Sequence, residues 1–370
     1  MHTAYCNSGH YASLWCGIIE SSMSTPQGAL PELISPYMSA LIEKSGGATG
    51  PLGRQFISSR SEYSQTQGGN PDPQDEASFE VAPGLIYKYQ GKKDKNGQTI
   101  YPGRALWTIS RFCATYCRFC FRGRMVGLPV GVSGESNEAL AQKPYLSDED
   151  IEQVKIFLTT HTEINEVILS GGDPFITSKP YFEKIILTVS ALQKSGQLDF
   201  IRIHTRAPIT NPHTLHKSHI DILKAVHMPH IVLHINHPLE LTDAVKEKVL
   251  QLQRETGALL FSQTVLLRGV NDAPETLRTL FIQCAKWGIR PYYLHYTDPV
   301  SWAQDLVVPF DRAVQIWQEL RPTLSGIVDT VKFVVDTPGG VGKIAVPDSQ
   351  WSADMAYYTD FTHTKHTRPA

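Results

Sequence analysis

Three cysteines stand close together in the chain, as Cys113, Cys117 and Cys120 in a C-x3-C-x2-C spacing. In a reducing compartment such a group is more typical of a metal site than of a disulfide framework. Three thiolates on one loop can hold three irons of a cubane 4Fe–4S cluster, whose usual complement is four cysteines. The missing fourth ligand leaves one iron open, and S-adenosylmethionine offers an amino group and a carboxylate that can chelate it.

The alternative for these cysteines is a zinc site, which requires a fourth ligand such as a distant His or Cys. Zinc sites usually pair two cysteines as C-x2-C and repeat the pair, and the sequence contains no second pair. The neighbouring Arg118, Phe119 and Arg122 suit an anionic sulfur cluster that is partly screened from water. The pattern therefore favours an iron–sulfur cluster.

A glycine pair stands in the sequence Ser170-Gly171-Gly172-Asp173-Pro174. Two glycines allow the backbone to approach a ligand closely, and an acidic side chain beside them can receive an ammonium group. Alone, the same residues also fit an ordinary tight turn. Beside the cysteine loop, they are expected to hold a cofactor.

A lysine ends the glycine-rich sequence VDTPGGVGK, at Lys343. A phosphate-binding P-loop would need Gly at position 337 and Ser or Thr at 344, and Thr337 and Ile344 exclude it. A lysine in such a loop can instead form a Schiff base with pyridoxal phosphate if its surroundings help it to lose a proton. The alternative is a solvated lysine on a flexible turn.

The composition is that of a soluble globular enzyme. The 370 residues are 41% hydrophobic, and 34 Lys and Arg against 36 Asp and Glu give a formal net charge of −2. This balance argues against nucleic-acid and polybasic membrane partners. No apolar run approaches the roughly 18 residues of a membrane-spanning helix, and the first 20 residues lack a signal-peptide pattern, so a cytoplasmic protein is expected.

The elements that position these motifs show a regular rhythm from about residue 104. Between short apolar runs, Ser147–Thr159 and Thr242–Thr256 have the pattern of amphipathic helices. Such alternation indicates parallel βαβ units. The runs expected to form strands are Ala105–Ile109, Glu166–Leu169, Phe200–Ile203, Ile231–Ile235, Leu259–Leu267, Pro291–His295 and Lys332–Val335.

We therefore predict an α/β fold, a partial (β/α)6-type TIM-like barrel with a helical N-terminal extension. The expected divisions are an extension over residues 1–100, a barrel with the lysine loop over 101–345 and a tail over 346–370. Within the extension, Leu30–Lys44 predicts a helix, Ser58–Asp75 an exposed loop and Pro83–Tyr89 an extended segment. Nearly every motif follows a predicted strand, where functional residues of such barrels lie.

The motifs also occur in an order that is more specific than any one of them. After the cysteines come SGGDP (170–174), RIHTRAP (202–208), HINHP (234–238), SQTVLLRGVND (262–272), RPYYLHYTDP (290–299) and VDTPGGVGK (335–343). Together they resemble the lysine 2,3-aminomutase family of radical S-adenosylmethionine (SAM) enzymes. The resemblance runs from about Leu30 to Pro347 and includes ISPYM and PGLIYKY in the extension.

That resemblance implies three cofactors, a reaction and a substrate site. Arg122 would bind the substrate carboxylate, and Asp298 and Asp336 would receive the distal ammonium of L-lysine, which a 1,2-amino shift converts to L-β-lysine. A reducing electron donor such as flavodoxin or ferredoxin is implied, and a homo-oligomer is compatible with the resemblance. The implied cofactor residues are Cys113, Cys117 and Cys120 for the 4Fe–4S cluster, Ser170, Gly171, Gly172 and Asp173 for SAM, and Lys343 for pyridoxal phosphate. Four further strand-end residues are not assigned to either cofactor: His204, Arg206, His237 and Gln263.

The sequence also departs from the family. No cysteine follows Cys284 and Ala273 follows Asp272, so the zinc-binding cysteines of clostridial-type members are missing. His295 makes PYYLH resemble the branch that modifies a lysine of translation elongation factor P, whereas Asp336 is unlike that branch. The alternatives are therefore an aminomutase acting on that protein-bound lysine, on arginine or on another diamino acid, or a non-catalytic iron–sulfur protein.

Overall fold

The computed structural model describes residues 30–59, 62, 69–126, 145–337, 342–346, 350–351, 357–359 and 364–367. Its centre is a ten-stranded sheet in the order β1-β2-β5-β6-β7-β8-β9-β10-β11-β12. Strands β5 to β11 pair in parallel with their neighbours in chain order. These strands are β5 (Gly103–Ser110), β6 (Ile164–Gly171), β7 (Phe200–Thr205), β8 (His230–His234), β9 (Leu259–Val265), β10 (Ile289–His295) and β11 (Lys332–Asp336).

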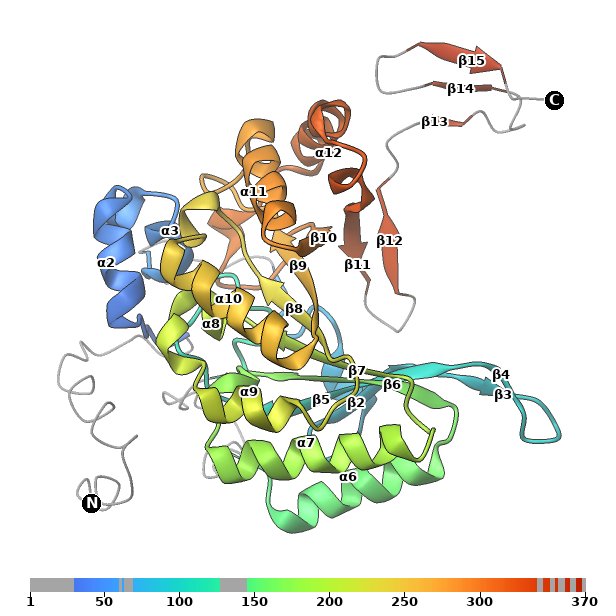
Figure 1. The fold of residues 1–370 in the computed structure, drawn as a ribbon. Helices are drawn as coiled ribbons and strands as arrows, with labels where there is room; N and C mark the ends of the chain where they lie inside the picture. The colour runs from blue at the N-terminus through green and yellow to red at the C-terminus, as the bar shows by residue number, and fades with distance from the viewer. Residues whose placement is uncertain are drawn as a thin grey trace.

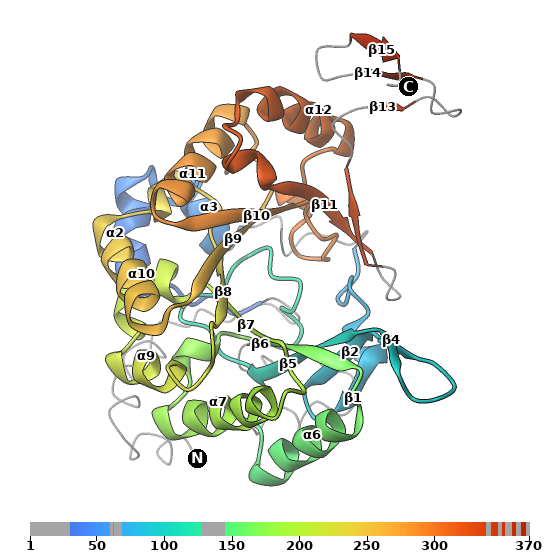
Figure 2. The same cartoon turned by 45° about the vertical axis from the view of Figure 1, so that its right-hand side comes forward.

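Helices cover the outer side of the curved sheet and connect its parallel strands (Figures 1 and 2). Each predicted strand is present, and the α/β barrel-like fold is confirmed. The connecting helices are α6 (Asp148–Thr160), α7 (Lys179–Lys194), α8 (Ala207–Thr210), α9 (Lys217–Leu223), α10 (Asp243–Thr256), α11 (Pro274–Lys286) and α12 (Phe310–Leu320).

Antiparallel strands flank the parallel part at both edges. On one side β2 (Leu85–Tyr89) pairs with β5, and β1 (Glu80–Ala82) pairs with β2; on the other, β12 (Lys343–Ala345) pairs with β11. Among the described residues β1 and β12 do not pair with each other, so the sheet remains an open, partial barrel. The β11–β12 register places Lys343 directly opposite Asp336.

The strands alternate between an apolar outer face and a polar inner face. Along β7, Ile201 and Ile203 belong to the large apolar cluster under the helices, whereas Arg202 and His204 point to the opposite face. The same period places His234 of β8 on the inner face. The concave side of this sheet is therefore lined by polar groups that can receive a ligand.

Two helix boundaries illustrate how local sequence determines the elements. Helix α6 begins with a capping box between Ser147 and Asp150, as its Ser-Asp-Glu-Asp opening predicts. The predicted helix Leu30–Lys44 begins later, at Pro36 of α2 (Pro36–Lys44). The reason is that Ser35 is the N-cap and accepts from the backbone of Met38, and proline is favoured in the first turn.

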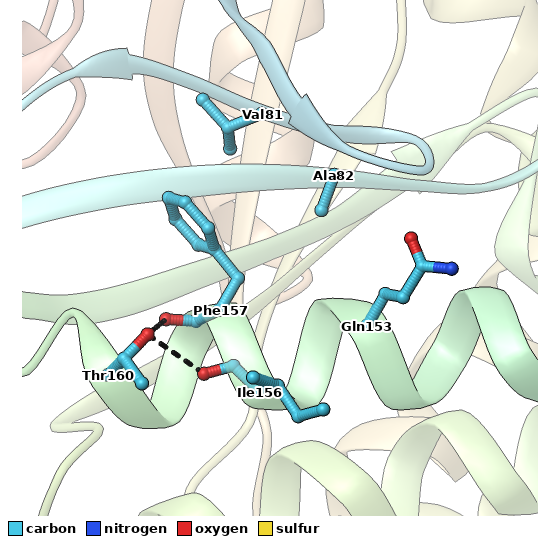
Figure 3. A pocket seen from close by; sticks show the side chains of 6 residues that line it. All are labelled: Val81, Ala82, Gln153, Ile156, Phe157 and Thr160. Carbon is cyan, nitrogen blue, oxygen red and sulfur yellow. Dashed lines mark hydrogen bonds between the residues drawn. The ribbon is translucent and has the colours of Figure 1, made fainter.

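Outside the barrel lie two small sheets and one shallow depression. A hairpin of β3 (Lys92–Lys93) and β4 (Thr99–Tyr101) projects from the molecule, and β13 (Gln350–Trp351), β14 (Tyr357–Thr359) and β15 (Lys365–Thr367) form a three-stranded sheet in the predicted tail. The depression lies between β1 and α6 and includes none of the predicted site residues; it is lined by Val81, Ala82, Gln153, Ile156, Phe157 and Thr160 (Figure 3). No helix in the described ranges combines the length and apolarity needed to cross a bilayer.

Candidate active site

The predicted site residues gather at the carboxyl ends of the parallel strands. The cysteine loop follows β5, and Figure 2 shows this teal segment inside the curve of the sheet. The glycine pair ends β6, Arg206 follows β7, and Asp336 ends β11. Residues that are far apart in sequence therefore converge at one edge of the barrel, as expected for this class of fold.

The three cysteines lie in the loop after β5, on the concave side of the sheet, which is here called the recess. Each remains partly exposed, yet burial among protein atoms raises the thiol pKa of all three, and that of Cys120 to about 12. The pKa of Cys113 is raised further by Asp173 and by the other two thiols, which shows that the three side chains lie close enough to interact. A neutral thiol is favoured here unless a positive charge or a metal compensates the thiolate.

Arg206 supplies such a positive charge. Its guanidinium donates to Cys117 Sγ at 2.7 Å and opposes the effect of burial on the pKa of that thiol. The guanidinium lies between the rings of Phe56 and Phe119, at 4.7 and 5.3 Å from their centroids. Arg206 is thus a buried cation aimed at a cysteine sulfur.

A buried polar network holds Arg206 in this position. Its Nη2 donates to Gln55 Oε1 at 2.6 Å and to Glu240 Oε1 at 3.1 Å. The amide of Gln55 donates to Glu240 at 2.9 Å, and Asn236 donates to Gln55 at 3.0 Å. Because the Glu240 carboxylate is fully buried, its charge is stable only beside this cation and these donors.

Residues of the N-terminal extension also hold the cysteine loop in position. Arg118, which stands between Cys117 and Cys120 in the sequence, forms a buried ion pair with Glu62, and its Nε donates to Glu62 Oε1 at 3.0 Å. The same guanidinium donates to the carbonyl of Leu30, and the backbone amide of Arg118 donates to the carbonyl of Gln55 at 2.8 Å. The loop conformation therefore depends on residues of the extension.

The glycine pair brings two backbone segments into contact. Gly171 has a φ of 119°, and a Cβ on Gly172 would lie 2.1 Å from the carbonyl oxygen of Phe112. The amide of Gly172 donates to Ser110 and that of Asp173 to Phe112, both at 2.6 Å. Only glycines permit this approach, which fixes the β6 turn against the start of the cysteine loop.

Asp173 is saturated by protein donors. Its buried carboxylate accepts from the backbone amides of Phe175, Arg206 and Ala207 and from the hydroxyl of Thr205, at 2.7 to 3.0 Å. These donors fill the lone-pair sites of a carboxylate. The geometry therefore favours the turn-forming alternative for this side chain over a direct contact with an ammonium group.

Arg122, two residues after Cys120, is buried and already paired. Its Nε and Nη2 donate to the two oxygens of Glu76, each at 2.7 Å, and its Nη1 donates to Ser170 Oγ at 3.0 Å. Burial alone would lower the pKa of Arg122, but the Glu76 carboxylate raises it. The guanidinium is thus permanently charged and held in one orientation.

The two predicted aspartates differ in their partners. Asp336 accepts from His295 Nδ1 at 2.7 Å and is ion-paired with Lys343. Although burial opposes it, the hydrogen bond from His295 and the charge of Lys343 hold the pKa of Asp336 well below its usual value. Asp298 accepts from the neutral amide of Gln74 at 2.5 Å, and burial, followed by the charge of Asp336, raises its pKa to about 7.

His295 is neutral in this arrangement. Burial lowers its pKa, and the charge of Lys343 lowers it further. Because a carboxylate can only accept, the ring proton is on Nδ1, and Nε2 is buried without a hydrogen-bond partner among the described residues. The Nε2 atoms of His204 and His234, which lie on the same inner face, are likewise buried without a hydrogen-bond partner among the described residues.

Lys343 is exposed, and aromatic side chains lie near it. Its Nζ lies 5.6 Å from the ring centroid of Tyr293, and Tyr89 lies within 3.6 Å of a Cβ built on the adjacent Gly342. The guanidinium of Arg104 stacks on Tyr89 at 4.0 Å. An aromatic ligand that carries an anionic group could stack on these tyrosine rings and pair with Arg104, next to the amine of Lys343.

Comparisons with known proteins now identify the class. The model of the radical SAM superfamily matches residues 107–280, which run from β5 through the cysteine loop to α11. The chain is a radical SAM protein, and this class of enzyme uses a 4Fe–4S cluster and SAM.

The chain belongs to the lysine 2,3-aminomutase family. It is 30% identical over 334 residues to the L-lysine 2,3-aminomutase of Methanococcus maripaludis, covering 90% of this chain and 70% of that relative. It is 31% identical over 284 residues to the L-lysine 2,3-aminomutase of Escherichia coli, covering 76% and 74%, respectively. A solved radical SAM methyltransferase from Sphaerobacter thermophilus is 16% identical over 81% of this chain and 95% of its own, with a TM-score of 0.44, which is too low to add to the argument.

The residues of the recess fit the cofactors of this class. Partly exposed thiols with an arginine donating to one sulfur suit an anionic iron–sulfur cluster. In the part of the chain that the structure describes, no three Cys, His, Asp or Glu side chains are arranged to hold a single metal ion.

The sequence did not predict the residues that orient the site residues through hydrogen bonds. Within the exposed loop predicted over Ser58–Asp75, residues 60–61 and 63–68 lie outside the described residues, and the prediction is wrong at Gln74, which is only 8% exposed. The following Glu76 is only 6% exposed. Polar residues between glycines and prolines gave no signal of burial. Gln55 and Glu240 lie in a helix and a turn whose local patterns carry no chemistry, and only the fold brings them to Arg206.

Proposed function

We propose that this chain is a radical SAM aminomutase that uses pyridoxal phosphate on Lys343 to convert L-lysine to L-β-lysine by a 1,2-amino shift. The observation that carries the proposal is the clustering of Asp298 with two ion pairs: the charges of Asp336, Lys343 and Glu76 all act on the pKa of Asp298, Lys343 is paired with Asp336, and Glu76 is paired with Arg122. That arrangement offers one basic and two acidic receptors, which match the carboxylate and the distal ammonium of a basic amino acid.

The cofactors supply the difficult chemistry: when bound, the cluster and SAM provide a carbon-centred radical, and pyridoxal phosphate provides the route for nitrogen migration. This chain positions the substrate. Arg122 binds the α-carboxylate, for which its fixed guanidinium still has unused N–H groups, and Asp298 and Asp336 receive the distal ammonium. Holding both ends places the α- and β-carbons of the substrate at a defined point between these residues.

The cysteine loop and its neighbours would hold the other two cofactors. Cys113, Cys117 and Cys120 bind the cluster in this proposal, and the backbone of Ser170–Asp173 lies beside them where the amino acid part of SAM would reach the open iron. An electron donor of the flavodoxin or ferredoxin type and a cytoplasmic location are part of the same proposal.

Two observations bear on the alternative substrates. His295 hydrogen-bonds to Asp336, so the residue typical of the protein-modifying branch and the acid typical of the lysine-acting enzymes form one unit here. That unit keeps Asp336 ionised, which favours a basic side chain on the substrate. Protein-bound lysine, arginine and other diamino acids remain the substrates against which L-lysine is tested.

The experiment is an anaerobic reaction of reconstituted enzyme with SAM and a chemical reductant. L-lysine, L-ornithine, L-arginine and a lysine-containing elongation factor P are supplied separately, and the products are identified by mass spectrometry. We expect β-lysine from free lysine and none from Lys343→Ala enzyme that retains its iron. Absence of β-lysine from fully loaded wild-type enzyme would overturn the proposal. An amino shift on one of the other substrates would then identify that compound as the substrate.

A further inference from the structure

One short segment of the extension contacts both ends of the proposed substrate site. In the segment Asp72–Glu76, here called the strap, Glu76 accepts hydrogen bonds from Arg122, and Gln74 donates a hydrogen bond to Asp298. It is anchored at its start by Asp72, which pairs with Arg124 at 2.6 Å and accepts from the backbone amide of Glu76 at 3.1 Å. Arg122 and Asp298 are the residues proposed to receive the substrate carboxylate and ammonium.

The contact of Glu76 with Arg122 orients the guanidinium. Glu76 accepts from Nε and Nη2, Ser170 accepts from Nη1, and these contacts use three of the five N–H groups of an arginine. Both partners are less than a tenth exposed, so separating them would leave a buried carboxylate without its cation. The substrate carboxylate therefore binds beside Glu76, on the N–H groups that remain, and does not replace it.

The contact of Gln74 with Asp298 fixes the carboxylate without neutralising it. The Gln74 amide donates to Oδ1 at 2.5 Å, while its own oxygen and its backbone carbonyl accept from the Lys88 ammonium at 3.3 and 2.7 Å. Lys88 also donates to the carbonyl of Thr337 at 2.8 Å, which ties the strap to the loop after β11. Because the donor on Asp298 is neutral, the negative charge remains available to an ammonium group.

The spacing of the two receptors thus depends on the strap. Gln74 and Glu76 are two residues apart on one anchored segment, so the distance between the oriented guanidinium and the oriented carboxylate is set by a single local structure. Resting on the proposed function, we infer that Gln74 and Glu76 are positioning residues that determine substrate length, favouring an amino acid with the four-methylene side chain of lysine over its shorter homologue ornithine.

The test measures binding to loaded enzyme without reductant, so that no turnover occurs. Isothermal titration gives the Kd of lysine, of norleucine, which lacks the distal ammonium, and of 1,5-diaminopentane, which lacks the carboxylate. We expect Glu76→Gln to weaken lysine and norleucine about tenfold and to leave diaminopentane unchanged, since hydrogen bonds to charged groups have this magnitude. Gln74→Leu should weaken lysine and diaminopentane similarly, leave norleucine unchanged and reduce the preference for lysine over ornithine.

The matched control is Asp75→Asn, which lies between the two residues. Asp75 has a φ of 53°, a conformation that asparagine tolerates, and its side chain accepts from Ser78. This variant should bind all ligands as the wild type does. Should a variant lose iron or fold poorly, Glu76→Asp and Gln74→Asn, which keep the chemistry but shorten the reach, should give the same ligand pattern.

The outcomes separate the inference from the function on which it rests. If wild-type enzyme binds lysine and both variants bind all the ligands equally well, the strap has no role in recognition and the inference is overturned. Tighter lysine binding by Glu76→Gln would also overturn it, because Glu76 would then compete with the substrate carboxylate. If loaded wild-type enzyme does not bind lysine at all, the proposed function itself fails.

Discussion

The ionisation of Asp298 predicts how the enzyme responds to pH. Burial raises the pKa of this carboxyl group, the negative charge of Asp336 raises it further, and the result is about 7 in spite of the hydrogen bond from Gln74. Only the ionised carboxylate can pair with the distal ammonium of lysine. Since the group is protonated below its pKa, kcat/KM for lysine should fall as the pH is lowered through 7.

The size of the effect follows from the pKa. For a group that titrates at about 7, the ionised fraction is about 0.9 at pH 8 and about 0.1 at pH 6, so kcat/KM should fall about tenfold over this interval. Asp336 adds no inflection in this range, because its pKa lies well below its usual value and it stays ionised. The acid limb should therefore reflect one group.

Two variants test this assignment in the reconstituted enzyme between pH 6 and 8. Asp298→Asn should lower kcat/KM at pH 8 at least tenfold and remove the acid limb, since the titrating group is gone. Asp336→Asn should keep an acid limb but move it to lower pH, because it removes the negative charge that raises the pKa of Asp298. An inflection that stays in place in both variants would refute the reasoning, since the titrating group would then lie elsewhere.

Three further predictions concern the cofactors and the fold. Replacing Arg206 by Gln should lower the midpoint potential of the cluster, because a cation is removed from a ligand sulfur. Replacing Glu240 by Gln should raise the midpoint potential, because the charge of Arg206 is then no longer balanced. Redox titration followed by electron paramagnetic resonance measures both potentials, and shifts of the same sign would contradict the argument. Replacing Lys343 by Ala should abolish the visible absorbance of bound pyridoxal phosphate while iron content stays at the wild-type level, and retention of the band would show that another lysine holds the cofactor. Replacing Glu62 by Gln should lower the free energy of unfolding of the protein by about 3 kcal/mol, because Arg118 remains buried without its counter-charge. Denaturant unfolding measures this free energy. If it does not change beyond experimental error, water reaches the guanidinium of Arg118.

The strands and the main motifs could be predicted from the sequence because their signals are local. Strands such as β6 and β8 are short runs of Val, Ile and Leu bounded by turn residues, and the helix predicted over Thr242–Thr256 is α10, with Thr242 as its N-cap. The cysteine spacing and the glycine pair are also local. Each of these features depends on residues within a few positions of one another, so a single sequence contains the information.

The polar contacts that orient the site could not be predicted, because each joins residues that are distant in sequence. Glu76 and Arg122 are separated by 46 positions, and Gln55 and Arg206 by 151. Neither partner has a local pattern that points to the other, and a glutamate in a polar stretch is usually exposed. The glycine pair shows a different limit, since Asp173 has the same local pattern whether it binds a ligand or closes a turn, and only its saturated hydrogen bonding distinguishes the two.

The distribution of charge in the recess explains why Asp298 is the group that responds to substrate. The ion pairs of the site and its supports are Arg118–Glu62, Arg122–Glu76, Arg202–Glu166, Arg206–Glu240 and Lys343–Asp336. Each of these carboxylates has a cation of its own, whereas Asp298 accepts a hydrogen bond from the neutral amide of Gln74, and burial followed by the charge of Asp336 raises its pKa. An ammonium group placed beside it would supply the missing charge and lower that pKa, so ligand binding and ionisation of Asp298 are linked. Lysine binding should therefore release protons near pH 7, where part of Asp298 is protonated in the free enzyme, and release fewer as the pH rises. Norleucine, which lacks the distal ammonium, should show no such dependence.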